Sequence, residues 1–90
     1  MLFRSLRFAA AYLSSRRLEA AERCARSAVD YMAATDLITM HADASLQLGD
    51  ILRAQGRHSE ANEVFHRADD LYRRKGTLVG VAAVQERLAG

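Results

Sequence analysis

Two stretches of the chain carry the same pattern of small and apolar residues forty positions apart. In the later stretch these residues recur at spacings of three and four, with charged residues between them: Ala61, Val64, Phe65, Ala68, Leu71 and Tyr72. The earlier stretch has the same spacings at Ala21, Cys24, Ala25, Ala28, Tyr31 and Met32. Such spacings place the residues on one face of an α-helix. The pattern therefore predicts two copies of one helical unit.

The segment ahead of each of these helices is also repeated. Four positions of the later segment, all apolar or small, have counterparts of the same kind forty residues earlier: Leu46, Leu48, Gly49 and Leu52 match Leu6, Phe8, Ala9 and Tyr12. Breaks are expected at Ser14-Ser15 and at Gln55-Gly56, because glycine can adopt the left-handed conformation that ends a helix. Each unit is therefore predicted to be a helical hairpin, in which Gly49 and Ala9 lie where the two helices come closest.

A further break is expected at Lys75-Gly76-Thr77. The cations Arg73, Arg74 and Lys75 suit the C-terminus of a helix, and Thr77 can cap the next one. Absence of proline and only five glycines also favour helices over a turn-rich β fold. We expect one all-α domain over residues 1–90, made of a hairpin at 2–33, a hairpin at 36–74 and a terminal helix at 77–89. Its five helices are predicted at 2–14, 17–33, 36–54, 57–74 and 77–89.

The second unit, SLQLGDILRAQGRHSEANEVFHRADDLY, resembles a tetratricopeptide repeat. The similarity rests on six matched positions at the family's intervals: Leu48, Gly49, Gly56, Ala61, Phe65 and Ala68. The sequence departs from the family at Ser45, where tryptophan is frequent, and at Leu52, where tyrosine is usual. The resemblance implies antiparallel hairpins stacked as a short solenoid, whose small residues Ala61 and Ala68 admit the neighbouring helix.

More narrowly, the run from RLEAAERCARSAVDYMAATD to the end of the chain looks like the C-terminal region of large bacterial regulators. In those proteins, often actinobacterial, tetratricopeptide repeats follow a cyclase-like or signalling-ATPase domain. The resemblance implies a sensory helical array that works by contact with other proteins.

Charge and cysteine content give little indication of a partner or compartment. Thirteen basic and eleven acidic residues give a net charge of +2, too balanced to indicate nucleic acid. Cys24 is the only cysteine, so no disulfide is expected and a cytoplasmic location is the default. Arg4 and Arg7 interrupt the apolar N-terminal run, which falls short of the ~18 residues that span a membrane. Neither a signal peptide nor a membrane segment is expected.

The candidate metal ligands and the cysteine are expected to serve in packing or on the solvated surface. Glu63 and His66 have the Glu-x-x-His spacing of di-iron bundles, but the equivalent positions of the first unit hold Arg23 and Arg26. His41 and His58 add no ligand set, so no metal or cofactor is expected unless a symmetric dimer supplies a second pair. Cys24 is expected to pack in the core, since it falls on the apolar stripe in register with Val64.

An enzyme is not expected, because the chain has no nucleophile elbow, no glycine-rich phosphate loop and no triad-like spacing. The segment DILRAQGRHSEANEVF also fits a DNA-binding helix-turn-helix. Its second helix, however, presents Glu60, Glu63, Asp69 and Asp70, which are unsuited to contact phosphates. DNA binding therefore remains an alternative, behind a protein-interaction module and ahead of a metal- or ligand-binding helical dimer.

Two surfaces are predicted to make those protein contacts. The first is a mixed polar groove suited to a protein or peptide: Asp43, Leu46, Asp50 and Arg53. The second is an apolar patch on the first unit: Phe3, Leu6, Ala10 and Leu13. Monomers seldom expose large apolar patches, and two repeats fall short of the roughly three usually needed for stability. We therefore expect a homodimer, or a partner that covers the patch.

Overall fold

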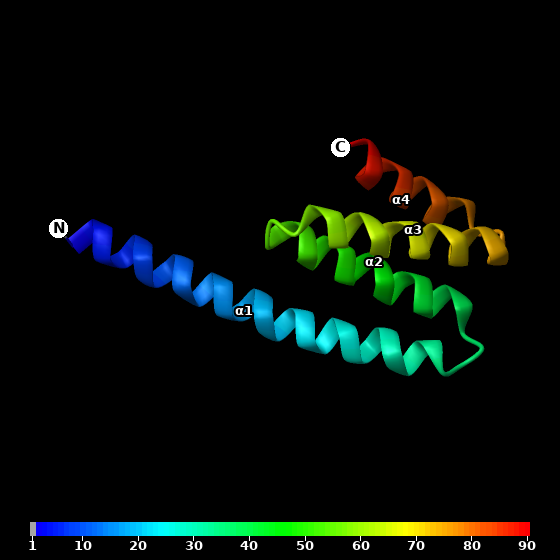
Figure 1. Cartoon of the computed structure of the whole chain (residues 1–90), viewed down its shortest axis with the longest axis horizontal. Coiled ribbons are helices and arrows are strands. Elements are labelled where there is room, and N and C mark those ends of the chain that lie inside the picture. The colour runs from blue at the N-terminus through cyan, green and yellow to red at the C-terminus, as the bar shows by residue number, and fades with distance from the viewer. Residues whose placement is uncertain (1) are drawn as a thin grey trace.

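The computed structural model describes the backbone of residues 2–90 and the side chains of residues 15–90. Within residues 2–90 it contains four α-helices and no strand: α1 (Leu2–Ala33), α2 (Ile38–Ala54), α3 (His58–Lys75) and α4 (Leu78–Ala89). Helices adjacent in sequence pack side by side in antiparallel order, and α4 also touches α2 (Figure 1). The predicted all-α class is confirmed.

The prediction of two helices between residues 2 and 33 is wrong, because α1 runs without a break for 32 residues. The expected stop at Ser14-Ser15 contains neither glycine nor proline. Serine costs only about 0.5 kcal/mol relative to alanine inside a helix, so it does not force an end. Residues 2–33 therefore form no hairpin, and the described chain has four helices rather than five. Only the second repeat unit folds as the hairpin that both units were expected to form.

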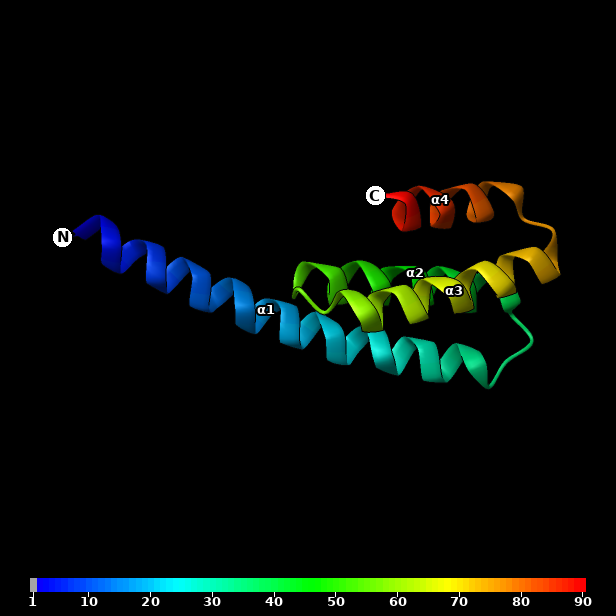
Figure 2. The same ribbon diagram turned by 45° about the horizontal axis from the view of Figure 1, so that its top comes forward.

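α1 gives the molecule its elongated shape. A helix of this length spans about 48 Å, close to the longest dimension of the 54 × 28 × 19 Å molecule. The C-terminal part of α1 packs against α2, whereas its N-terminal part runs past the turn between α2 and α3 (Figure 1). Figure 2 shows the same projection from a second direction, with no other helix of the chain alongside it. We call residues 2–14 of α1 the overhang.

The two predicted glycine breaks are confirmed. Gly56 and Gly76 have φ of 79° and 74°, the left-handed region that a side chain disfavours. After each glycine the next amide closes the helix end, with Arg57 N donating to Leu52 O and Thr77 N donating to Tyr72 O, both at 2.9 Å. This is the Schellman pattern of helix termination. Thr77 holds the N-cap position of α4, but its side chain makes no capping hydrogen bond, contrary to prediction.

The core lies mainly between α2, α3 and α4, and α1 contributes Ala25 to it. Phe65, Leu52 and Val84 are the largest fully buried side chains, and burying each contributes about 1.5–3 kcal/mol. Ala61 and Ala68 are 0% exposed, as their role as small packing residues predicts. A Cβ atom built on Gly49 would lie 2.6 Å from Cδ1 of Phe65, which confirms that α2 and α3 approach closely there.

The expectation that Cys24 packs in the core is wrong, because its side chain is exposed. Its neighbour Ala25 is buried at 8% exposure, and Val29 packs against the same core. One step along a helix turns the side chain by about 100°, so a contact face centred on Ala25 leaves Cys24 outside. Ala21 and Ala28, in register with Ala61 and Ala68, are only half-buried.

Candidate interaction surfaces

The four residues of the predicted groove all lie on α2, where α3 and α4 engage them. Asp43 Oδ1 accepts a hydrogen bond of 2.5 Å from the Tyr72 hydroxyl of α3. Burial, and then this bond to Asp43, raise the pKa of the Tyr72 phenol, so the hydroxyl stays a donor over the whole physiological range. Leu46 is half-buried and packs against the core.

Asp50 and Arg53 hold the C-terminal helix against α2. The Asp50 carboxylate accepts two hydrogen bonds from the Arg87 guanidinium, 2.7 Å from Nε and 3.1 Å from Nη2. Arg53 donates to the main-chain carbonyl of Arg87, and its guanidinium stacks 5.2 Å from the centre of the Phe65 ring. The Asp50 carboxylate raises the pKa of Arg87. The polar residues of the predicted groove thus help to dock α3 and α4 within this chain.

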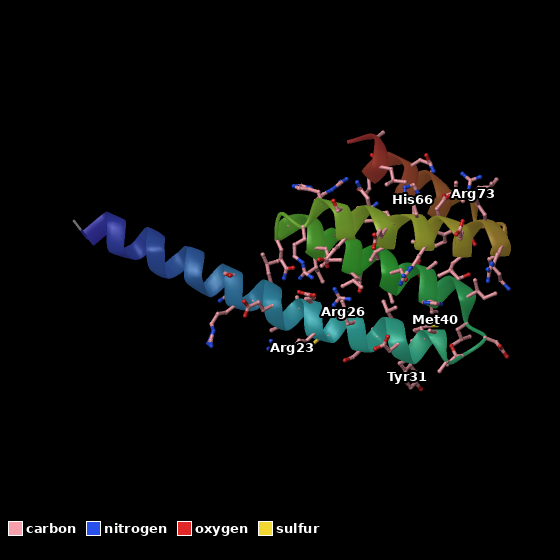
Figure 3. The ribbon with its side chains drawn as sticks, in the orientation of Figure 1. Arg23, Arg26, Tyr31, Met40, His66 and Arg73 are labelled. Atoms are coloured by element: carbon pink, nitrogen blue, oxygen red, sulfur yellow. The ribbon has the colours of Figure 1, made fainter. Side chains whose placement is uncertain are left out.

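A second polar cluster, which the sequence did not reveal, ties α1 to the start of α3. Glu22 accepts hydrogen bonds from Arg26 Nε at 2.8 Å and from Arg57 Nη1 at 2.7 Å. Arg57 also donates to Glu60, and Arg26 lies 3.6 Å from Glu60. Arg26 occupies the side of α1 that faces the other helices (Figure 3). The hydrogen bond from Arg26, with help from Arg57, lowers the pKa of Glu22.

A hollow of about 650 Å³ opens beside this cluster, between α1 and the turn that joins α2 to α3. Its walls combine apolar Leu18 and Ala54 with charged Glu22 and Arg57. The hollow lies at the point where the overhang leaves the bundle, since Ser15 is also part of its wall.

The predicted self-association patch lies outside the described side chains, because Phe3, Leu6, Ala10 and Leu13 belong to the overhang. Between Glu19 and Tyr31 of the same helix, four of the exposed residues are uncharged: Ala20, Cys24, Ser27 and Tyr31. Tyr31 is 69% exposed and extends from the side of α1 turned away from α2 (Figure 3). α1 thus offers uncharged surface on a side that its own chain leaves open.

Comparisons with protein-family models, with curated proteins and with solved structures find no match to this chain. The surfaces described above must therefore be interpreted from their own chemistry.

The described residues fit neither what the metal-binding alternative requires nor what the DNA-binding alternative requires. Glu63 and His66 are exposed on α3, and no group of three or more histidine, cysteine or acidic residues within the described range could hold a metal ion. In the segment that fits a helix-turn-helix, α2 and α3 lie side by side and antiparallel (Figure 1), whereas that motif sets its helices at about 90–120°. None of the described helices is both long enough and apolar enough to span a bilayer.

Proposed function

We propose that this chain is a non-catalytic protein-interaction module of the tetratricopeptide type that associates with itself through α1. The observation that carries the proposal is the overhang, which continues the helix past every other element of the chain (Figures 1 and 2). Isolated helical segments of about 12–15 residues are only marginally stable in water. An apolar helical segment of that length is therefore expected to bury its surface against another protein chain.

The tetratricopeptide assignment is supported by how α2, α3 and α4 approach one another. Gly49 of α2 faces the Phe65 ring of α3, and Gly80 of α4 faces the ring of Tyr72 on α3. Close helix contacts at a small residue opposite an aromatic ring thus occur on both sides of α3. Each added hairpin in such a stack would repeat this contact, which is how solenoids bury a continuous core.

Self-association is supported by the sequence of the overhang. Phe3, Leu6 and Leu13 are large apolar residues on the overhang, which has no other helix of the chain beside it in Figures 1 and 2. Burying one large apolar side chain contributes about 1.5–3 kcal/mol. A second copy that covered these residues would therefore contribute free energy comparable to the stability of a small domain, about 5–15 kcal/mol.

The proposal is tested by measuring the mass of the intact chain in solution with light scattering after size-exclusion chromatography. A dimer is expected, and a monomer at all concentrations would overturn self-association. In a variant with Phe3→Ser and Leu6→Ser, four apolar side chains are lost per dimer, so association should weaken by at least about a thousandfold. The control variant carries Leu78→Ser and Val79→Ser, two residues that are 81% and 83% exposed on α4. It should remain a dimer.

A further inference from the structure

Between Glu19 and Tyr31, the exposed residues of α1 separate into a charged side and an uncharged side. The charged side is formed by Glu19, Arg23, Arg26 and Asp30. The uncharged side is formed by Ala20, Cys24, Ser27 and Tyr31, which alternate in spacings of four and three. Tyr31 marks the direction of this side, away from α2 (Figure 3). The uncharged side thus has the spacing of a helix-pairing stripe.

The same spacing continues toward the N-terminus through the predicted patch. Counting back by alternating threes and fours from Ala20 gives Arg17, Leu13, Ala10, Leu6 and Phe3. Because α1 is a single helix from Leu2 to Ala33, its period places these positions with Cys24 and Tyr31 in one line that winds slowly around the helix. We call this line of nine positions the seam. Arg17 is its only charged member, and its average spacing of 3.5 is that of helices that pair as a coiled coil.

The sizes of the seam residues fit an antiparallel partner. The N-terminal half holds the large residues Phe3, Leu6 and Leu13, and the C-terminal half holds the small residues Ala20, Cys24 and Ser27, followed by Tyr31 at its end. When two copies of α1 run in opposite directions and cross at Arg17, Leu6 and Leu13 each meet a small residue, and Phe3 meets Tyr31 at the ends of the pair. Leu13 then lies opposite Ala20 of the second copy, and Leu6 lies opposite Ser27. The two helices also match from end to end, which leaves no overhang uncovered.

The distribution of charge along α1 also favours an antiparallel pair. Residues 2–17 contain four arginines and no acid, whereas residues 18–33 contain three acids and two arginines. A parallel pair would set the two strongly basic halves against each other. An antiparallel pair sets each basic half against a half that carries a net negative charge, and it also opposes the two helix dipoles. Arg17 meets its own copy at the centre, where a long side chain can turn its guanidinium out to solvent.

We propose that a second copy of this chain occupies the seam, with the two α1 helices antiparallel and each overhang covering the Cys24 side of the other. This inference rests on the proposed self-association and specifies its geometry. In the pair, Ala10 of one copy lies opposite Cys24 of the other. Within one copy these residues are fourteen positions apart, which is about 21 Å along a helix.

The single natural cysteine makes the geometry directly testable. Ala10→Cys places a second thiol on the seam, and Ala11→Cys, one residue along, is the matched control off the seam. Each variant and the parent chain are oxidised with copper phenanthroline, separated on a non-reducing gel and mapped by mass spectrometry. The antiparallel seam predicts that most of the Ala10→Cys chain becomes a covalent dimer linked from residue 10 to residue 24. The parent and Ala11→Cys chains should remain largely uncrosslinked.

Three results would overturn the inference. A dimer of the parent chain linked through Cys24 would show a parallel pair. A residue 10–24 link within one chain would show that residues 2–33 fold back on themselves. Failure of Ala10→Cys to crosslink, in a chain that light scattering shows to be dimeric, would leave self-association intact but place it elsewhere. A monomer by light scattering would instead remove the proposed self-association itself, so the two failures are distinguishable.

Discussion

The contact between Gly49 and the Phe65 ring allows a quantitative test of how α2 and α3 pack. In Gly49→Ala the new methyl group would lie 2.6 Å from Cδ1 and 2.9 Å from Cζ of Phe65, so the ring has to move. Phe65 is 0% exposed, so its ring can move only by displacing its neighbours in the core. Overpacking of this type costs about 1–3 kcal/mol, while replacing glycine by alanine in a helix returns about 1 kcal/mol. The net expectation is a loss of about 1 kcal/mol.

The assay is urea unfolding followed by circular dichroism, with thermal melting as a second measure. A loss of about 1 kcal/mol lowers the melting temperature of a domain this size by roughly 4–8 °C. Phe65→Leu supplies the control background, because a smaller side chain gives the methyl group room. There Gly49→Ala should be neutral or stabilising, and the difference between the two backgrounds measures the coupling of the two sites. If Gly49→Ala stabilises the parent chain, the close approach of α2 and α3 at Gly49 is refuted.

Two further predictions concern the polar contacts between helices. Tyr72→Phe removes the hydrogen bond to Asp43 and should lower the free energy of unfolding by about 1 kcal/mol. In urea unfolding this change appears as a lower midpoint with an unchanged slope. An unchanged midpoint would contradict the contact. The pKa of Glu22 is lowered in the fold by Arg26 and Arg57, so its contribution is complete above its ordinary pKa and is lost as pH falls toward the lowered one. Stability should therefore fall as the pH drops below the ordinary pKa of 4.5 toward the lowered one, and it should fall less in Glu22→Gln. An identical pH profile for that variant would show that Glu22 contributes nothing.

The hairpin of α2 and α3 could be predicted from sequence because its signals are local. The buried alanines recur at helical spacing, and Gly56 and Gly76 end the helices in the one backbone region that glycine favours. The failure at Ser14-Ser15 has the same origin. A repeat pattern requires a break there, but two serines supply no physical reason for one, so the local preference for helix prevails.

The surfaces were less predictable because they depend on which helices become neighbours. Glu22 and Arg26 are recognisable as a pair four residues apart on one helix. The bond from Arg57 to Glu22, however, arises only when the start of α3 lies beside α1. Asp50 was assigned to a partner groove for the same reason, because nothing in the sequence indicated that Arg87 of α4 would reach it.

The claim on which the proposals depend is that α1 is one continuous helix that carries its N-terminal residues beyond the bundle. The most direct test is double electron–electron resonance spectroscopy, which measures the distance between two spin labels. The labels are attached at Ser5→Cys and Arg23→Cys, in a Cys24→Ala background. The labelled chain is diluted with unlabelled chain, so that only distances within one copy are recorded. Eighteen residues make five full turns, so the labels lie on the same side of a continuous helix at about 27 Å. A hairpin with a break at Ser14-Ser15 would bring them to about 10–15 Å, and that distance would contradict the continuous helix.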